Sequence, residues 1–273
     1  MIVDLKQHLD DKITIITPVY KPNHELFQTC VTNMLAQTHK NFMWNIIFDG
    51  KESQGCLRDE MHAALADPRI RIIVNNKRKG VSYSRNVGLE NIAGSYVGFI
   101  DCDNWYHIEA LKKVTDHIKL MKQYPQLEPL TQRLLLCVGQ AVIRQQKHYN
   151  NSPGLFHVGF RVEPNLDFKA ELQSNRIDLN QCFFSKSDIR FDEQFTRLVD
   201  WDYILAHFSK NFHYLSFPMF LSFYDDFKRK NRITVVEDFE RNKQKLYNKW
   251  SKEFEERFGK KDERVIANRP TKV

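Results

Sequence analysis

Short strand-like runs alternate with helix-like segments through the first third of the chain. The alternation begins with a β-branched run at 13–17 that Pro18 closes, followed by apolar side chains at helical intervals over 25–36. Further segments continue in the same order: 43–48, 57–66, 70–74, 82–93 and 96–100. Ser82 is the expected N-cap of the helix at 82–93. Alternation at this short spacing predicts βαβ units on a parallel sheet.

The rhythm changes after a predicted helix at 108–122. Three strand-like segments follow with no long helix between them, so we expect this part to include antiparallel strands: 134–143, 154–162 and 180–184. A helix is predicted at 201–208 and one or two buried strands at 212–224. A capping-box pattern, Thr234 with Glu237, then opens a last helix. Its apolar stripe needs a surface to pack on, and comprises Phe239, Leu246, Trp250, Phe254 and Phe258.

The length of 273 residues suits a single α/β domain with an appendage. We place the domain at 1–225, and a basic amphipathic helical tail, packed on the domain or extending it, at 226–273. Residues 228–273 hold 15 Lys or Arg against 8 Asp or Glu and so account for the whole net charge of +7. Such a tail can meet an anionic surface of lipid headgroups, nucleic acid or a partner protein, or it is a solvated helix face.

Several features indicate a reducing compartment. The first twelve residues contain acids where a secretory signal carries a long apolar stretch, and no run of about 18 apolar residues follows. The five cysteines are scattered and have no Cys-x-x-Cys spacing, which indicates neither a disulfide framework nor a zinc site. We therefore expect a cytoplasmic protein that contacts the inner face of the membrane through its basic tail.

Two carboxylates flank Cys102 at the end of the predicted strand 96–100. Asp101 and Asp103 can aim together at a hard divalent cation, which takes oxygen ligands and bridges to a diphosphate. Mg²⁺ or Mn²⁺ would offset the charge that develops on a departing nucleoside diphosphate. Alternatively, Asp103 or Asn104 caps the helix that follows.

The predicted topology also indicates where a ligand binds. In open parallel sheets, ligands occupy the crevice beyond the carboxyl ends of the strands, where helix N-termini point their amides. We expect three segments to share this rim: 18–21, Asp49 and 101–104.

Four segments occur in an order that is more specific than any one of them: KITIITPVY at 12–20, QTHKNFMWNIIFDG at 37–50, GVSYSRNVG at 80–88 and GSYVGFIDCDN at 94–104. Together they resemble the family 2 glycosyltransferases of the GT-A fold, closely over about residues 12–110 and more faintly to about 225. The resemblance implies a three-layer α/β sandwich around a mostly parallel, Rossmann-like central sheet, with a small antiparallel part and a C-terminal helical extension. The nucleotide-binding half would be 12–110 and the acceptor half 111–225.

The resemblance also implies a reaction. Such enzymes move a sugar from a nucleotide-diphosphate sugar, here expected to be a UDP-sugar, to a hydroxyl of a glycan or glycolipid in cell-surface polysaccharide synthesis. Mn²⁺ or Mg²⁺ is the expected cofactor. The acceptor hydroxyl attacks the anomeric carbon from the face opposite the diphosphate, so the configuration inverts, and a base must remove its proton.

Donor-binding roles carry over to the positions that match the family's motifs. Pro18 and Tyr20 match residues that line the nucleoside pocket, although strand termination and aromatic packing explain them as well. Asp49 matches the acid that accepts a hydrogen bond from a uracil N–H, and an Asp-Gly turn is its alternative. Arg85 matches the Arg of an Arg-Asn pair beside the diphosphate, where its fork of donors suits phosphate, unless it is a surface residue.

Acidic residues carry the remaining roles. By resemblance, Asp101 contacts the ribose or the metal, and Asp103 contacts the metal directly. Asp200 lies at the position of the catalytic base, in a segment where Val199 replaces the usual Glu. Asp202 is a rival for the base, and Asp200 can instead be the N-cap of the helix that follows.

Two other classes of protein compete with the enzyme. A catalytically silent module that binds a nucleotide or a glycan can share the fold, because fold does not fix function. A nucleic-acid-binding protein would account for the isoelectric point near 9.0, but the sequence has no recognised binding motif of that kind, so we expect no nucleic-acid partner. The expected partners are the nucleotide sugar, a glycan or glycolipid acceptor, and a membrane surface.

Overall fold

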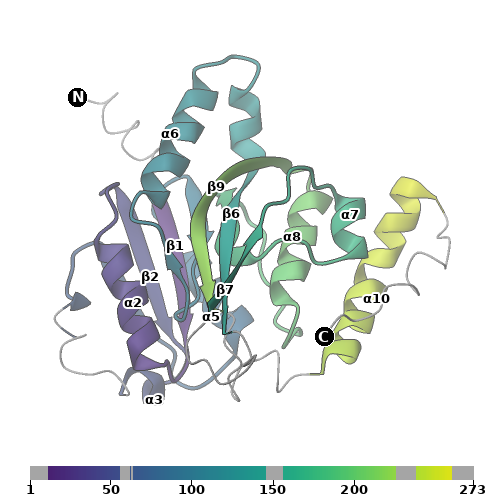
Figure 1. Cartoon of the computed structure of the whole chain (residues 1–273). Coiled ribbons are helices and arrows are strands. Elements are labelled where there is room, and N and C mark those ends of the chain that lie inside the picture. Colours follow the sequence, from purple (N-terminus) through teal and green to yellow (C-terminus); the bar gives the residue numbers. More distant parts are fainter. Residues whose placement is uncertain (1–11, 56–61, 63, 146–155, 226–237, 260–273) are drawn as a thin grey trace.

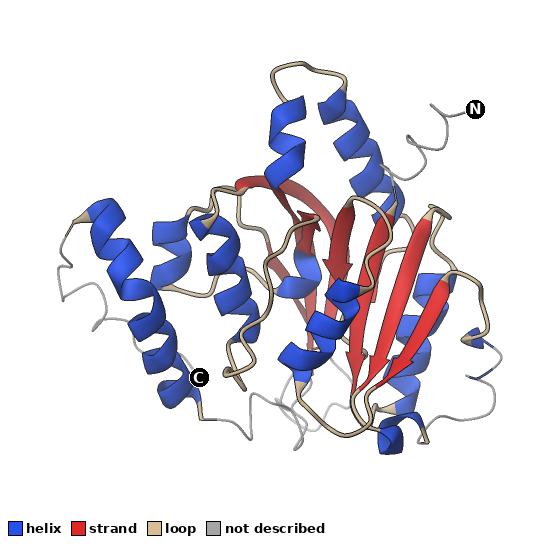
Figure 2. Ribbon diagram, turned by 180° about the vertical axis from the view of Figure 1, so that it is seen from behind, coloured by secondary structure: helices blue, strands red, loops and turns tan. Residues whose placement is uncertain are grey.

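The computed structural model describes residues 12–55, 62, 64–145, 156–225 and 238–259, and it has a central sheet with helices on both faces (Figures 1 and 2). The described residues form nine strands in the order β3-β2-β1-β4-β8-β6-β9-β5, with β7 paired to β6. Strands β5, β7 and β8 run opposite to the other strands. This mixed sheet, with most strands in one direction and helical layers around it, confirms the predicted α/β fold class.

The first half of the chain builds four adjacent parallel strands: β1 (Ile13–Val19), β2 (Phe42–Phe48), β3 (Ile70–Val74) and β4 (Tyr96–Phe99). Strands β1 and β2 are buried on both faces, which is why their side chains are mostly apolar instead of alternating with polar ones. The helices between the strands are α2 (His24–Leu35), α3 (Lys51–Gln54) and α5 (Val81–Glu90). The predicted βαβ units are therefore confirmed.

The second half adds strands of both directions: β5 (Trp105–Tyr106), β6 (Leu134–Gln145), β7 (Phe156–Arg161), β8 (Cys182–Ser185) and β9 (His213–Asp225). The antiparallel strands expected here are present, although β9 runs parallel to β6. The region predicted as one or two strands is the single strand β9, with register shifts opposite Val138 and Gly139. The helical segments are α6 (Ala110–Lys122), the 3-10 helices η1 (Glu128–Arg133) and η2 (Leu179–Gln181), α7 (Phe168–Gln173) and α8 (Val199–Ser209).

Two hydrophobic clusters lie on the two faces of the sheet. One contains Ile15 of β1 together with buried residues of α2 and α6. The other contains the next residue of the strand, Ile16, with residues of α5, α7 and α8. Because successive side chains of a strand point to opposite faces, these two neighbours belong to different cores. Helix α5 lies close to β1, since a Cβ added at Gly88 would lie 2.5 Å from Cγ2 of Ile16.

Helix α10 (Phe239–Phe258) lies beside α7 and α8 at one side of the molecule (Figure 1, yellow). Its Leu246 is fully buried, and Trp250 is 8% exposed within the same cluster as α8. Leu246, Trp250 and Phe254 of the predicted apolar stripe therefore pack on the second half of the domain, whereas Phe258 is 47% exposed. Asp238 is the N-cap, and the capping box expected from Thr234 and Glu237 lies outside the described residues.

Two other local predictions have a different outcome. The N-cap of α5 is Gly80, at a φ of 96° that favours glycine. The Ser82 hydroxyl is buried and donates to the backbone oxygen of Phe195, so Ser82 is not the cap. The helix predicted at 57–66 lies largely outside the described residues.

Candidate active site

The carboxyl ends of β2, β1 and β4 lie side by side, because these strands are parallel neighbours. The segments that leave them contain Tyr20, Asp49 and Asp101. Helix α5 starts at the same edge and places Arg85 in its second turn. The structure thus brings these side chains to one rim of the sheet, as the sequence predicted.

The carboxylate of Asp49 organises the loop that leads into α5. It accepts hydrogen bonds from the backbone N–H groups of Lys79 and Gly80, each 2.8 Å long, and from Nδ2 of Asn75 at 3.1 Å. Asn75 also donates to Oγ of Ser84 at 3.1 Å, which links the loop to the helix. Asp49 is 4% exposed. An Asp-Gly turn alone therefore does not explain Asp49, because its side chain also joins the end of β2 to the loop that leads into α5.

Arg85 and Asp101 form an ion pair in which Nη2 lies 2.9 Å from Oδ1. The arginine side chain is only 5% exposed, so the alternative of a surface arginine is wrong. Its Nε and Nη1 atoms are buried and have no hydrogen-bond partner among the described residues. Buried donors without partners are costly. A guanidinium with two unpaired, buried donors beside the rim has hydrogen-bonding capacity of the kind that phosphate oxygens satisfy.

Asp101 is held from the other side by Asn180 of η2. The backbone N–H of Asp101 donates to Oδ1 of Asn180 at 2.6 Å, and Nδ2 of Asn180 donates to Oδ2 of Asp101 at 3.1 Å. Asn180 in turn donates to Oδ1 of Asp178 at 2.6 Å. The first acid of the Asp-x-Asp pair thus lies between α5 and a helical turn from the second half of the chain.

Asp103 is half-buried in the turn after β4, where Asn104 N–H donates to the backbone oxygen of Asp101 at 3.0 Å. Helix α6 begins only at Ala110, after Glu109, so neither Asp103 nor Asn104 caps it. Within the described part of the chain, no group of three or more His, Cys, Asp or Glu side chains is placed to hold a metal. Asp101 and Asp103 supply carboxylate oxygens, the ligand type that Mg²⁺ and Mn²⁺ take together with substrate phosphates and water.

The negative charges of Asp103 and Asp101 both act on the pKa of one interior thiol, that of Cys30. Burial raises the pKa of Cys30, and the negative charges of Asp103 and Asp101 raise it further. The thiol of Cys30 also lies 3.9 Å from the backbone oxygen of Asp101. Both acids of the pair therefore lie within electrostatic range of one point under the rim.

Asp200 lies in the first turn of α8, half-buried, with Leu198 at the N-cap position. Asp200 is therefore not the cap. Burial raises its pKa to about 6, the positive charge of Arg85 opposes the shift, and the negative charges of Asp178 and Asp101 add to it. These interactions place Asp200 near the ion pair of Arg85 and Asp101, although the residues are far apart in the sequence.

Asp202, the rival carboxylate, faces α10. It accepts hydrogen bonds from Nζ of Lys249 at 2.8 Å and from Nε1 of Trp250 at 2.9 Å, and its side chain is 3% exposed. These contacts identify Asp202 as an anchor between two helices. Of the two acids, only Asp200 is influenced by the charges at the rim.

Pro18 and Tyr20 lie at the end of β1. Pro18 pairs with Ile47 inside the strand, so it does not terminate it. The ring of Tyr20 is 36% exposed, with the guanidinium of Arg78 4.3 Å and Nζ of Lys21 5.4 Å from its centroid. Its aromatic contacts are therefore with cations at the surface.

Sequence reasoning missed Asn75, Asp178 and Asn180. Asn180 was assigned to a strand, whereas the structure places it in η2 before β8. One pattern does announce this turn: Asp178 and Gln181 form a capping box across it. Nothing in the sequence announces that Asn180 reaches Asp101, because that contact joins residues 79 positions apart.

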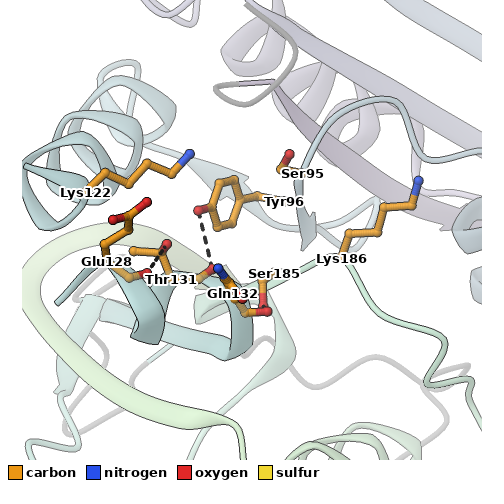
Figure 3. Close-up of a pocket in the computed structure, with 8 residues that line it drawn as sticks. All are labelled: Ser95, Tyr96, Lys122, Glu128, Thr131, Gln132, Ser185 and Lys186. Atoms are coloured by element: carbon orange, nitrogen blue, oxygen red, sulfur yellow. Dashed lines mark hydrogen bonds between the residues drawn. The ribbon is translucent and has the colours of Figure 1, made fainter. Parts of the chain in front are cut away.

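A hollow of about 350 Å³ lies elsewhere, at the amino end of β4 (Figure 3). Its walls come from β4, β8, α6 and η1, and consist of Ser95, Tyr96, Lys122, Glu128, Thr131, Gln132, Ser185 and Lys186. None of the predicted site residues lines it. We place the active site at the carboxyl rim because the charged and polar side chains converge there.

Residues 14–124 match the family model described as glycosyl transferase family 2. Over this stretch, which is less than half of its length, the chain is similar to that family. The match covers the parallel half of the chain and contains Asp49, Arg85, Asp101 and Asp103. Asp200 lies outside it.

Curated relatives align with the same part of the chain. Glycosyltransferase GlyA of Streptococcus pneumoniae serotype 4 is 35% identical over 114 residues, which are 40% of this chain and 16% of GlyA. The glucosyltransferase WfgD of Escherichia coli, named as acting from UDP-Glc on α-D-GlcNAc-diphosphoundecaprenol, is 27% identical over 95 residues, which are 35% of this chain and 36% of WfgD. The chain thus spans well under half the length of these relatives.

Solved structures extend the similarity of fold over the second half. Residues 1–349 of TarS from S. aureus, in complex with UDP-GlcNAc, superpose with a TM-score of 0.68 at 13% identity, covering 94% of this chain and 70% of that one. The likeness supports the GT-A fold beyond residue 124. Among the described helices, none is both long and apolar enough to span a bilayer.

Proposed function

We propose that this chain is an inverting glycosyltransferase that moves a sugar from a UDP-sugar to a hydroxyl of a glycan or glycolipid acceptor in cell-surface polysaccharide synthesis. The observation that carries the proposal is the ion pair of Arg85 and Asp101 at one rim of the sheet, whose charges also act on the pKa of Asp200. A cation, a diphosphate donor and a base for the acceptor have complementary residues there. UDP is the proposed nucleotide because TarS was solved with UDP-GlcNAc and WfgD is named for UDP-Glc.

The donor would be bound in two parts. Tyr20, Pro18 and Asp49 would contact the nucleoside, with Tyr20 offering an exposed ring face for stacking. Arg85 would bind the diphosphate through the donors that have no partner among the described residues. Because a buried guanidinium loses its hydration on folding, phosphate oxygens would restore hydrogen bonds that the protein alone leaves unmade.

Asp101 and Asp103 would hold Mn²⁺ or Mg²⁺ beside the diphosphate, with Asp101 alternatively on the ribose. The bound cation would offset the negative charge that develops on the leaving UDP. Asp101 already shares its oxygens with Arg85 and Asn180. By the resemblance of the Asp-x-Asp pair, Asp103 would make the direct metal bond, and Asp101 would contribute through the lone pairs that these two hydrogen bonds leave.

Asp200 would act as the general base. A carboxylate with a pKa of about 6 is mostly ionised near neutral pH and still accepts a proton more readily than an ordinary aspartate. It would remove the proton of the acceptor hydroxyl as the oxygen attacks the anomeric carbon. The domain at 1–225 would provide this site, and the tail at 226–273 would support it and meet the inner face of the membrane, where we place the protein.

A screen of nucleotide sugars for thermal stabilisation tests the proposal, because a ligand that binds only the folded state raises its melting temperature. We expect a UDP-sugar to stabilise the protein with Mn²⁺ and much less with EDTA. Asp103→Ala should lose this metal dependence. Asp116→Ala is the matched control, since Asp116 is an exposed carboxylate on α6 that forms an ion pair with Lys112. Equal stabilisation of Asp103→Ala and the wild type would contradict the proposed metal site.

Hydrolysis of the UDP-sugar separates an enzyme from a silent binding module. The proposed enzyme should release UDP slowly in the presence of Mn²⁺, and faster when the correct acceptor is added. Binding of UDP-sugars without any turnover, across a panel of glycan acceptors, would favour the silent module.

A further inference from the structure

Asn180 makes a set of hydrogen bonds around Asp101 that requires a carboxamide group, with an acceptor oxygen and two N–H donors. Its Oδ1 accepts from the backbone N–H of Asp101 at 2.6 Å. Its Nδ2 donates one hydrogen to Oδ2 of Asp101 at 3.1 Å and the other to Oδ1 of Asp178 at 2.6 Å. A backbone N–H can only donate, which fixes the orientation of the amide. These bonds use both N–H hydrogens and one of the two oxygen lone pairs of the asparagine amide.

The position of Asn180 is itself held firmly. The residue is 2% exposed, and its own N–H donates to Oδ1 of Asp178 at 2.8 Å. Asp178 also accepts a hydrogen bond from Nε2 of Gln140 at 3.3 Å, which ties η2 to β6. The amide that reaches Asp101 is thus fixed by the second half of the chain.

The carboxylate of Asp101 consequently accepts hydrogen bonds from two directions. Arg85 binds Oδ1 from α5, and Asn180 binds Oδ2 from η2. A carboxylate has about four lone-pair directions, so each oxygen keeps one for a ligand. Without Asn180, the carboxylate could rotate about its Cα–Cβ bond toward Arg85, and its backbone N–H would be left without its partner.

We propose that Asn180 is a positioning residue that fixes the donor- and metal-facing orientation of Asp101. The inference rests on the proposed function, because it assumes that Asp101 faces the nucleotide and the cation. Residues that orient a metal ligand typically change metal affinity by roughly 10- to 100-fold when they are removed. Asn180 would therefore act on donor binding from outside the segment that matches the family model.

Titration calorimetry of UDP, with Mn²⁺ and with EDTA, tests the inference on the full chain. We expect Asn180→Ala to weaken the Mn²⁺-dependent binding of UDP by roughly 10- to 100-fold. In EDTA the change should be much smaller, because the metal contribution is then absent. Asn180→Ser keeps a single hydroxyl, which replaces at most part of the hydrogen bonds. Its Mn²⁺-dependent affinity for UDP should lie between those of Asn180→Ala and the wild type. Asn180→Ser replaces Asn180→Ala in the experiment if the alanine variant does not fold.

Asn45→Ala is the matched control. Asn45 is fully buried, and its Nδ2 donates to the backbone oxygens of Gly88 and Asn91, away from the rim. Its loss should lower the melting temperature without changing the affinity for UDP and Mn²⁺. A purely structural role for Asn180 would give the same pattern as Asn45→Ala, and that result would overturn the inference. Absence of UDP binding by the wild type would overturn the proposed function together with the inference, whereas normal binding by Asn180→Ala would overturn the inference alone.

Discussion

The indole Nε1 of Trp250 donates a hydrogen bond of 2.9 Å to the carboxylate of Asp202, and this contact joins α10 to α8. Lys249 adds an ion pair of 2.8 Å to the same carboxylate. Asp202 is two residues from Asp200, so α10 supports the helix that carries the proposed base. The C-terminal helix is thus a structural part of the site's surroundings.

Replacing the indole tests this anchor. Trp250→Phe keeps most of the ring packing but removes a donor from a buried carboxylate, so we expect it to lower the free energy of unfolding by about 1–3 kcal/mol. Urea denaturation measures the change. Tyr124→Phe, at an exposed aromatic residue, is the control and should change stability by less than about 0.5 kcal/mol. A Trp250→Phe protein as stable as the wild type would show that the bond contributes little.

The two acids at the start of α8 should respond differently to removal of their charge. Asp200→Asn should lower kcat by at least about 100-fold, the usual contribution of a general base, while UDP binding stays intact. Asp202→Asn should reduce stability and keep measurable transfer, because its carboxylate faces Lys249 and Trp250. Steady-state kinetics with radiolabelled donor distinguishes the two, and full activity of Asp200→Asn would refute its assignment as the base.

The activity should fall at acid pH. Because Asp200 must be ionised to accept a proton and its pKa is raised to about 6, kcat should drop about tenfold per pH unit below that value. A plateau of kcat that continues unchanged to pH 5 would exclude Asp200 as the titrating base.

Arg85 should influence that acid limb. Its positive charge lowers the pKa of Asp200, against the effect of burial. Arg85→Ala should therefore move the acid limb of the kcat profile to higher pH and, in addition, weaken UDP binding. Arg85→Lys should retain the charge effect but lose the two-pronged hydrogen bonding, so its limb should stay near that of the wild type while its affinity for UDP falls. An unshifted limb in Arg85→Ala would contradict the predicted coupling.

Asp200 should also affect stability in a direction opposite to an ordinary ion-paired aspartate. Its pKa is raised from 3.8 to about 6 in the folded protein, so the folded state binds more protons between those values. The free energy of unfolding contributed by this group is therefore greatest at low pH and is lost as pH rises through about 6. Asp200→Asn should be more stable than the wild type at pH 7, and this advantage should shrink toward pH 4. Urea titrations at both values provide the comparison.

Local patterns in the sequence were sufficient for the parallel half of the fold. The β-branched run at 13–17 and its successors are buried on both faces, so their apolar composition is set by the sheet that they form. The rim followed from the rule that parallel strands end at one edge. The prediction of Ser82 as the N-cap was wrong. A serine before a helical pattern usually caps the helix, whereas here Gly80, with a positive φ, is the N-cap.

Contacts between distant segments could not be predicted in the same way. The choice between Asp200 and Asp202 depended on α10, whose Lys249 and Trp250 reach back about 47 residues to one acid and not to the other. Asn180 gave no periodic or capping pattern of its own that pointed to Asp101. Such side-chain contacts are decided by tertiary packing, which a single sequence does not display.

The hydrogen bond between Asn180 and Asp101 joins two parts of the chain with different relationships to known proteins. The stretch that matches the family model contains Asp101 but not Asn180. On the proposed role of Asn180, an exchange of the C-terminal half between related chains would have to bring an equivalent amide to the same place. The two halves would then have to change together at this contact.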